Sequence, residues 1–562
     1  MRPDVEAFYR GENWQLWRLL GAHPVAQGWA FTVWAPHARR VQVLGDWNGW
    51  DLYHPLELTY CEDGLWRGLA RTAQAWQRYQ YNVQGPDGQW RMRTDPFALQ
   101  YELPPRMASL LVPPNDLPRP RMRQNRGADC LQIYEAHAGS WRRHWDGRYY
   151  TGPELADGLV PWLCSQHYTH VEFLPLAEHP FDGSWGYQGS GYFAPTARVG
   201  GAAGFRALVD RLHEVGLGVI MDFVPVHFAA DEGRLGWFDG GPLFELPGIS
   251  AWGDCCFDLH SGPVRSFLYS AALFWLEQCG CDGLRVDAIG AALWRNGSTA
   301  EFFRTLTDGL HARCPGTLLI AEDGGPCAVT APTAAGGLGF DLAWDIGSAP
   351  AALQLLTAPL EARRAGFDAL AHGLEFANAQ AVHALSHDDC APDCGSLWAR
   401  MPGDPAQKLA QLRLLYLLQA SCPGATLQFM GSELGQPQAF DPGWEPQWNL
   451  LNHPEHRALV DYCAALHRFR AQHPALYRPG KVCWALRDAD RGVLALVRQA
   501  AGETLLCVFN LSPEPRHGCR LDRVAPGAVC RFAAGPVEGV VHIANGSGWV
   551  DLPPLSGAVF GW

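Results

Sequence analysis

Apolar and polar residues alternate over the first hundred or so positions in a way that is typical of β-strands. Residues 29–34 (WAFTVW) alternate large and small side chains, and residues 41–44 (VQVL) follow a Pro-His-Ala turn. Residues 78–83 (RYQYNV) come before a Pro-Asp-Gly turn. Short strands broken by turns predict an all-β sandwich of about a hundred residues. Residues 103–127, rich in proline and arginine, predict a linker.

From residue 130 onwards, short apolar runs alternate with stretches of helical periodicity. Phe205, Leu208, Val209 and Leu212 have the i, i+3, i+4, i+7 spacing of one helix face. The expected strands are 131–134, 171–174, 219–222, 284–287, 318–322, 339–341, 382–385 and 426–430, and the clearest further helices are 264–278 and 299–312. Eight strand–helix units over roughly 340 residues predict an α/β fold, a TIM (β/α)8 barrel with enlarged loops. A doubly wound open sheet is the structural alternative.

Strand patterns return near the C-terminus. Residues 504–509 (TLLCVF) and 557–560 (GAVF) predict a small β domain, which we expect to be a sandwich. The predicted division is therefore an N-terminal β-sandwich module (1–112), a barrel (113–478) and a C-terminal β domain (479–562).

Charge and composition narrow the functional classes. The 562 residues carry 44 basic and 57 acidic side chains, a formal net charge of −13, and no run of Lys or Arg. We therefore expect no nucleic-acid partner. The apolar stretches fall short of the ~20 residues that a membrane span needs. The N-terminus carries acids where a signal peptide would be apolar, which predicts a cytoplasmic protein with no membrane partner.

Two residue types stand out by number. The 17 cysteines are scattered, and we expect them to be reduced thiols that fill space, although Cys390 and Cys394 are close enough to pair if oxidised. The 24 tryptophans favour sugar binding modestly, because flat rings pack against the apolar faces of sugars.

Carboxylates follow four of the predicted barrel strands. Asp222, Asp287 and Glu322 each end an apolar run, and His387-Asp388 follows the run at 382–385. Active sites of TIM barrels lie at the carboxyl ends of the strands, so these side chains are expected at one mouth of the barrel. Taken singly, each could instead be a helix cap or a strand-end ion pair.

Crowded carboxylates suit acid–base chemistry. Burial and like charge raise the pKa of one carboxyl, which becomes a proton donor, while a neighbour stays ionised as a nucleophile. Arg285 lies two residues before Asp287, so both face the same side of a strand and the guanidinium would keep Asp287 ionised. A metal hydrolase is the chemical alternative, since His227, His387 and several aspartates could ligate a metal. No HExxH or similar close spacing supports it.

At these residues the chain resembles the α-amylase superfamily and, within it, the 1,4-α-glucan (glycogen) branching enzymes. The four superfamily segments occur in order at 222–227 (DFVPVH), 283–288 (GLRVDA), 320–322 (IAE) and 385–388 (LSHD). Motifs similar to the branching enzymes occur at 134–141 (YEAHAGSW), 178–200 (EHPFDGSWGYQGSGYFAPTARVG), 337–347 (GLGFDLAWDIG), 400–416 (RMPGDPAQKLAQLRLLY) and 429–436 (FMGSELGQ). The N-terminal region is similar to the carbohydrate-binding-like β-sandwich that precedes such barrels.

The resemblance implies a role for each matched residue. Asp287 would be the nucleophile, Glu322 the general acid/base and Asp388 the carboxylate that stabilises the transition state. Tyr187 would stack on the sugar at the cleaved bond. The hydrogen-bonding shell around that sugar would be Asp222, His227, Arg285 and His387.

The implied reaction is a retaining double displacement. An α-1,4 bond of amylose, glycogen or amylopectin is cleaved, and the released chain is rejoined to a 6-hydroxyl of a glucan as an α-1,6 branch. We expect no metal or organic cofactor, and a monomer.

Three loops depart from the family pattern. The segment after Asp287, residues 288–299, is short; Asp323-Gly324-Gly325 follows Glu322 where Glu-Ser is usual; and Asp389-Cys390 follows Asp388 where Glu is usual. All three are expected to rim the cleft, where they decide whether a glucan or water meets the intermediate. The alternatives are therefore an α-glucan hydrolase of the same superfamily, releasing malto-oligosaccharide or trehalose, and a catalytically weakened glucan-binding protein.

Overall fold

The computed structural model describes residues 2–61, 64–113, 116, 129–250, 252–295, 299–323, 328–525, 527–537, 541–544 and 547–562. By the contacts between its Cα atoms, the chain divides into two compact units. The first unit comprises residues 1–126, 137–158 and 172–340, and the second comprises residues 127–136, 159–171 and 341–562.

The N-terminal residues form two antiparallel sheets, as the alternating pattern predicts. In β2 (Gly28–Trp34), Trp29, Phe31 and Val33 are buried and the residues between them are half-buried, because successive side chains of a strand point to opposite faces. The first sheet orders β1 (Gly21–Val25), β2, β6 (Leu65–Ala70) and β5 (Thr59–Cys61). The second orders β4 (Leu56–Glu57), β3 (Arg40–Gly45), β7 (Arg78–Gln84) and β8 (Trp90–Arg93), with β9 (Ser109–Leu110) paired to β7. Residues 114–115 and 117–127 of the predicted linker lie outside the described residues, and β9 lies in its described part.

Eight parallel strands close into a barrel, which confirms the predicted fold class and excludes the open sheet. In order they are β10 (Gln132–Ala136), β11 (His170–Phe173), β14 (Gly218–Phe223), β17 (Gly283–Val286), β18 (Leu318–Ala321), β19 (Leu342–Trp344), β20 (Ala381–Leu385) and β21 (Ala425–Phe429). Every residue of β14 and of β17 is buried, because strands of such a barrel are covered on both faces.

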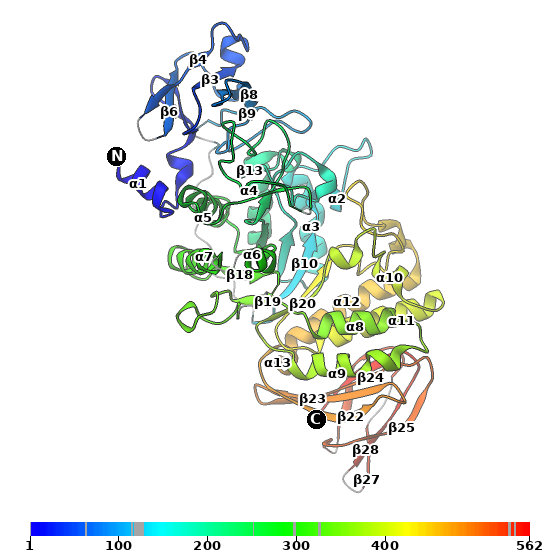
Figure 1. Ribbon diagram of the computed structural model, residues 1–562. Helices are drawn as coiled ribbons and strands as arrows, with labels where there is room; N and C mark the ends of the chain where they lie inside the picture. Colours follow the sequence, from blue (N-terminus) through cyan, green and yellow to red (C-terminus); the bar gives the residue numbers. More distant parts are fainter. Residues whose placement is uncertain are drawn as a thin grey trace. The chain divides into compact units, whose positions relative to one another are not determined.

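Helices connect most of the barrel strands (Figure 1). In α4 (Gly201–Glu214), the predicted stripe of Phe205, Leu208, Val209 and Leu212 is buried, as an amphipathic helix on a barrel requires. The first unit also contains α1 (Pro3–Arg10), α2 (Ala138–Trp141), α5 (Gly262–Glu277), α6 (Ile289–Arg295) and α7 (Ala300–Arg313). The second unit contains α8 (Ser348–Thr357), α9 (Phe367–Phe376), α10 (Leu397–Arg400), α11 (Pro405–Ala420), α12 (Pro454–Gln472) and α13 (Pro474–Tyr477). Helix α3 (Gly152–Ser165) has residues in both units.

One expectation about the barrel was wrong in detail. The strand predicted at 339–341 begins three residues later, as β19, because Gly339 has a positive φ of +76°, outside the usual range of a β-strand. The connection from β18 to β19 contains, within its described residues 328–341, a 3₁₀ turn at Thr333–Ala335. Pro332 and three glycines in this stretch disfavour a longer helix.

Two smaller antiparallel pairs extend the loops at the barrel. They are β12 (Ala177–Glu178) with β13 (Gly191–Pro195), and β15 (His227–Phe228) with β16 (Cys255–Cys256). The second pair matters below because it holds His227.

The C-terminal residues form the predicted β domain from two sheets. One orders β22 (Lys481–Asp488), β23 (Val493–Ala500), β24 (Glu503–Asn510), β29 (Ser556–Gly561) and β26 (Val529–Ala534). The other orders β25 (Arg516–Leu521), β28 (Ser547–Leu552) and β27 (His542–Ala544). An apolar core joins residues of both sheets, including Val508, Leu521 and Phe560. The three-part division at residues 112 and 478 stays a prediction.

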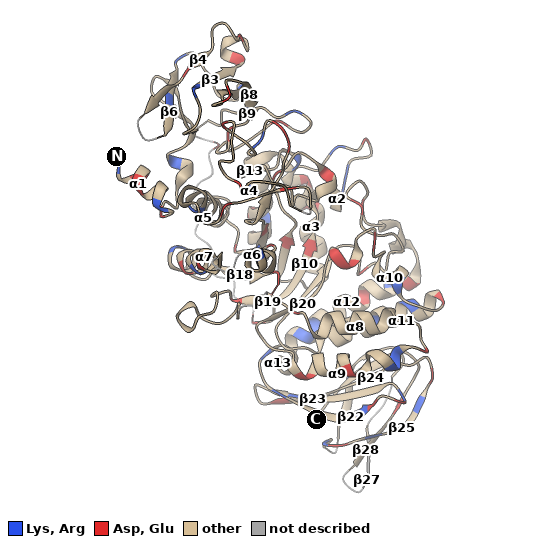
Figure 2. Cartoon of the chain, in the orientation of Figure 1, with Lys and Arg blue, Asp and Glu red and all other residues tan. Residues whose placement is uncertain are grey.

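Charged residues are dispersed over the chain. Figure 2 shows blue and red positions scattered among most elements, without a broad basic face in this view. Within the described residues, no helix has both the length and the apolar character that a membrane crossing requires.

Cys390 is buried and Cys394 exposed, and both are free thiols.

Glu433, in the second unit, is fully buried. Its Oε1 accepts hydrogen bonds from the Tyr134 hydroxyl (2.9 Å) and the Trp162 indole N–H (3.2 Å), whereas Oε2 has no partner among the described residues. Burial raises the pKa of Glu433 to about 7. The folded chain therefore holds this proton more tightly than the unfolded chain does.

We expect Glu433→Gln to raise the apparent Tm near about pH 8 and to change it little near about pH 5. A carboxyl with a raised pKa destabilises the fold as pH rises from its ordinary pKa of about 4.5 through about 7. The neutral amide keeps the acceptor oxygen and removes this loss, which is on the order of 1–3 kcal/mol. Thermal unfolding at both pH values measures it, with the exposed Glu455→Gln as the control. An equal shift at both pH values would contradict the prediction.

Candidate active site

Arg285 joins three carboxylates in the first unit. Its side chain is buried on β17, and Asp222 lies opposite it on β14. Arg285 Nη1 donates to both carboxylate oxygens of Asp222 (2.9 Å each) and to Asp287 Oδ1 (2.7 Å). Arg285 Nη2 lies 3.2 Å from Glu322 Oε1. Asp287 and Glu322 directly follow β17 and β18, so the strand-end carboxylates Asp222, Asp287 and Glu322 come together as predicted.

The environment separates the protonation states of Asp287 and Glu322. Burial acts to raise the pKa of Asp287, but the contacts with His227 and Arg285 outweigh it, and the pKa is lowered. Burial raises the pKa of Glu322 to about 7; Arg285 opposes the rise, and the negative charge of Asp287 adds to it. One carboxyl is thus kept ionised and the other able to hold a proton near neutral pH, which is the division of labour that acid–nucleophile pairs need.

His227 contributes a second positive charge next to Asp287. Its Nε2 lies 3.5 Å from Asp287 Oδ2, and its Nδ1 lies 3.1 Å from Asp254 Oδ2. Burial disfavours the charged imidazole, but Asp254 and Asp287 outweigh it and raise the pKa of His227 to about 9. Asp254 was not identified from the sequence. It also accepts a hydrogen bond from the side-chain amide of Gln188 (2.7 Å).

Tyr187 lies over the same cluster. Its hydroxyl donates to Asp222 Oδ2 (2.6 Å), and the centre of its ring is 5.8 Å from the Arg285 guanidinium carbon. The preceding turn places it there. Trp185 and Gly186 have positive φ values of +57° and +100°, and a Cβ on Gly186 would lie 2.2 Å from the carbonyl oxygen of Pro175. Glycine is therefore required at this position.

Two backbone contacts hold the loop after Asp287. Ala288 has a positive φ of +54°, and its N–H donates to Glu322 Oε2. Strained backbone of this kind is common at functional sites. The Gly290 N–H donates to Asp323 Oδ1, and a Cβ on Gly290 would lie 2.2 Å from Asp323 Oδ2. Asp323, one of the departures from the family pattern, thus ties the segment after β18 to the first turn of α6. Residues 296–298 and 324–327 lie outside the described residues.

In the second unit, His387 and Asp388 follow β20. The backbone N–H of His387 donates to Glu135 Oε2 (2.8 Å), and its Nδ1 lies 2.6 Å from Glu135 Oε1. His387 Nε2 lies 3.4 Å from Asp388 Oδ1, and the Asp388 side chain is 59% exposed. Glu135, on β10, is almost fully buried and was not singled out from the sequence, although it lies within the motif at 134–141. Asp389 accepts a hydrogen bond from the Ser386 N–H (3.0 Å).

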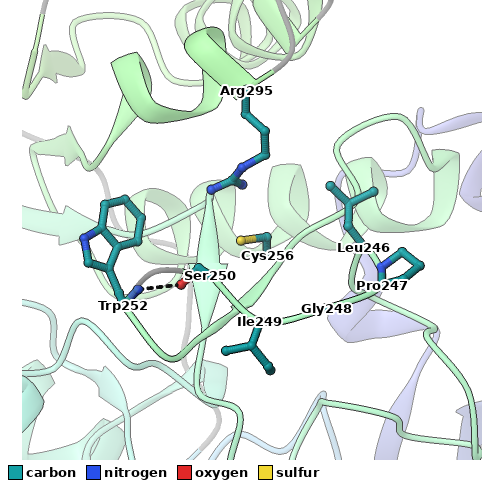
Figure 3. A pocket seen from close by; sticks show the side chains of 8 residues that line it. All are labelled: Leu246, Pro247, Gly248, Ile249, Ser250, Trp252, Cys256 and Arg295. Carbon is teal, nitrogen blue, oxygen red and sulfur yellow. Dashed lines mark hydrogen bonds between the residues drawn. The ribbon is translucent and has the colours of Figure 1, made fainter.

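A cavity of about 280 Å³ lies on the loop that joins β15 to β16 and at the end of α6. Figure 3 shows Trp252, Cys256 and Arg295 around it, with the backbone N–H of Trp252 donating to Ser250 Oγ. The half-exposed Trp252 ring is centred 5.2 Å from the His227 ring. An aromatic side chain of this kind offers a face for a sugar ring next to the carboxylate cluster.

Within the described residues, no three His, Cys, Asp or Glu side chains gather as a group that could hold a metal ion. The ion pairs of Asp222, Asp287 and Glu322 are instead made with Arg285, with His227 also near Asp287.

Comparison with solved structures shows the fold. The chain is similar to the pullulanase from Paenibacillus barengoltzii in complex with maltohexaose and alpha-cyclodextrin (TM-score 0.77, 16% identity, covering 100% of this chain and 97% of that chain). It is also similar to the pullulanase from Anoxybacillus sp. LM18-11 complexed with maltotetraose (TM-score 0.77, 15% identity, covering 100% and 89%).

Residues 19–98 match carbohydrate-binding module 48 (isoamylase N-terminal domain).

Comparison with curated proteins shows the family. The chain is 38% identical to the 1,4-alpha-glucan branching enzyme GlgB of Dechloromonas aromatica, covering 92% of this chain and 89% of the relative. It is 39% identical to that of Pseudomonas aeruginosa (92% and 76%) and 36% identical to that of Thiobacillus denitrificans (99% and 83%). Given identity at this level over most of both lengths, the chain belongs to the family of 1,4-alpha-glucan branching enzymes.

Proposed function

We propose that the protein cleaves an α-1,4 bond of a glucan and transfers the released chain to a 6-hydroxyl, which forms an α-1,6 branch. The observation that carries this proposal is the cluster around Arg285, in which Asp287 is held ionised and Glu322 is able to carry a proton. Membership of the branching-enzyme family favours transfer of the glucan chain over its hydrolysis. The cluster supplies the nucleophile and the proton donor that the reaction needs.

The proposed reaction has two steps. Asp287 attacks the anomeric carbon while Glu322 protonates the leaving oxygen, and a covalent glycosyl-enzyme forms. Glu322, now ionised, then removes a proton from the 6-hydroxyl of the acceptor, which attacks the intermediate. Two inversions retain the α configuration. The carboxylates do this chemistry themselves, so we expect no metal or organic cofactor.

The remaining residues are proposed to hold the sugar and stabilise charge. Tyr187 stacks on the ring at the cleaved bond, and Asp388 stabilises the positive charge that develops on the sugar. Glu135 orients His387 toward Asp388 through its two contacts. The proposed hydrogen-bonding shell is Asp222, His227, Arg285 and His387.

The N-terminal module is proposed to hold part of a glucan chain. A cavity of about 760 Å³ on its surface is lined by Trp50, Tyr53 and Trp90, among others. Tyr53 is 90% exposed, and the Arg40 guanidinium carbon lies 5.4 Å from the centre of the Trp90 ring. Exposed rings with polar neighbours suit stacking on glucose units.

The proposal includes a monomer that acts in the cytoplasm, with glucan as its partner and neither nucleic acid nor a membrane.

Incubation with amylose tests the reaction. We expect loss of iodine colour with little new reducing sugar, and new α-1,6 anomeric signals in the proton NMR spectrum. A large rise in reducing ends would identify the hydrolase alternative instead. Glycogen binding without any new linkage would identify the catalytically weakened binding protein.

A pH profile tests the assignment of Glu322. We expect kcat/KM for amylose to fall as pH rises above about 7, because the free enzyme must carry the Glu322 proton to start the reaction. Above that pKa, each further pH unit lowers the protonated fraction about tenfold. Initial rates between about pH 5 and about pH 9 measure the profile. A profile that stays flat to the alkaline end would contradict this assignment.

A further inference from the structure

A cavity of about 150 Å³ in the second unit is lined by four arginines. It lies where the 3₁₀ turn Arg363–Gly366, just before α9, meets the turn between β22 and β23 and the segment between β24 and β25. Figure 1 shows α9 beside the C-terminal strands of the same unit. The lining contains Arg363, Arg364, Arg491 and Arg516 but only two carboxylates, Glu361 and Asp490. This surplus of positive charge occurs in a chain of formal net charge −13.

The carboxylates do not neutralise the arginines. Arg364 Nε lies 3.0 Å from Asp490 Oδ1, which accounts for one pair. Among the described residues, Arg363, Arg491 and Arg516 make no ion pair with a carboxylate. Three of the four guanidinium groups around this small cavity therefore have no carboxylate of the described residues within ion-pair distance.

Arg363 is part of the structure of this junction. It is 6% exposed and donates to the carbonyl oxygens of Leu511 (2.7 Å) and Leu356 (2.8 Å) and to the side chain of Gln411. Its Nε is buried with no hydrogen-bond partner among the described residues. Burial lowers the pKa of Arg363 to about 10, so the group stays charged at neutral pH. Because this nitrogen is covered by protein atoms, the Arg363 side chain contributes its positive charge to the cavity but not this donor.

Arg516 shows the same feature. It begins β25, and its Nε is buried without a hydrogen-bond partner among the described residues. Arg491, by contrast, donates one side-chain hydrogen bond, to the His517 carbonyl oxygen (2.7 Å). Its other guanidinium N–H groups are left to bind a ligand. Planar guanidinium groups that line one cavity suit the several oxygens of a phosphate group.

We propose that this cavity binds a phosphate group, either free phosphate or the phosphate of a small phosphorylated compound. Its volume of about 150 Å³ is close to that of an engineered protein cavity that holds one benzene molecule, which is room for one such group. The bound oxygens would accept from Arg491 and Arg516 beside the positive charge of Arg363, and so would connect the turn before α9 to the C-terminal strands. A ligand that binds only the folded chain raises its stability, so the site acts as a stabilising anion site outside the catalytic cluster.

Binding is tested by isothermal titration and thermal unfolding of the full chain with three probes: orthophosphate, glucose 6-phosphate and ADP. Potassium chloride at equal ionic strength is the reference, because screening alone must not produce the effect. We expect saturable binding and a Tm that rises with probe concentration. If orthophosphate binds as tightly as the other two, the ligand is the free ion. If either compound binds at least about tenfold more tightly, the ligand is a phosphorylated compound.

Arg516→Gln is expected to weaken binding about tenfold to a hundredfold, the loss of one charge-assisted hydrogen bond. Arg520→Gln is the matched control, because Arg520 lies on the same strand with its side chain 68% exposed, 3.9 Å from Asp522. Arg491→Gln replaces Arg516→Gln if the latter fails to fold. The proposal is overturned if no probe binds saturably beyond the chloride reference, or if the cavity variants bind as tightly as Arg520→Gln. Neither measurement depends on branching activity.

Discussion

Asp287→Asn should lower turnover of amylose by roughly four orders of magnitude or more while leaving glucan affinity close to that of the unmodified chain. The amide has nearly the size and shape of the carboxylate but cannot form the covalent glycosyl-enzyme. It also removes the negative charge that faces Arg285 and His227, at 2.7 Å and 3.5 Å. Turnover by reducing-end and branch-linkage assays, together with glycogen affinity by gel retardation, measures the two quantities separately.

The control for this variant is Asp258→Asn, an amide exchange in the turn before α5. Asp258 accepts one backbone hydrogen bond from His260 and has no proposed part in the reaction. It should turn over amylose at nearly the unmodified rate. Normal turnover by Asp287→Asn would remove Asp287 as the nucleophile, whatever the behaviour of the control.

Glu322→Gln should lower turnover of amylose by about 10²–10⁴-fold, the usual contribution of a general acid. The loss of rate in Glu322→Gln should depend on the leaving group of the substrate. An α-maltosyl fluoride needs no proton to lose fluoride, so the first step should proceed and the covalent intermediate should accumulate. Asp287→Asn should fail with both substrates, because it lacks the nucleophile. Mass spectrometry of the intact protein detects the intermediate as an added glycosyl group.

Glu301→Gln is the control for the acid/base variant, since the Glu301 side chain is 72% exposed and lies on α7, away from the proposed chemistry. An equal loss of rate with the fluoride and with amylose would show that Glu322 does not act as the acid. The alkaline fall of the pH profile should also disappear in Glu322→Gln, which links the two measurements.

Much of the fold followed from local patterns. Each apolar run after residue 130 needed only a few neighbouring residues to be identified, and the carboxylates Asp222, Asp287 and Glu322 lie where those runs end. The 339–341 strand was misplaced because Gly339 turns the chain just before the apolar residues of β19.

The residues that the sequence did not reveal act through distant contacts. Glu135 and His387 are 252 positions apart, yet two contacts join them. Asp254 meets His227 through the pairing of β15 with β16, and Trp252 lies against the same histidine. Such residues occur on loops or in otherwise apolar strands, where no periodicity distinguishes them from residues with a purely structural role.

The sequence alone predicted the order of the strands and which carboxylates lie at their ends, because hydrophobic periodicity is a property of adjacent residues. The spacing of Arg285 and Asp287 also predicted that Asp287 stays ionised, and the family resemblance gave Glu322 its role as the acid, but the full difference in protonation between Asp287 and Glu322 could not be derived from the sequence. It depends on how deeply each carboxyl is buried and on which charges of Arg285, His227 and Asp222 face it. Burial and facing charge arise only when distant segments pack together, so the folded chain decides which carboxyl holds the proton.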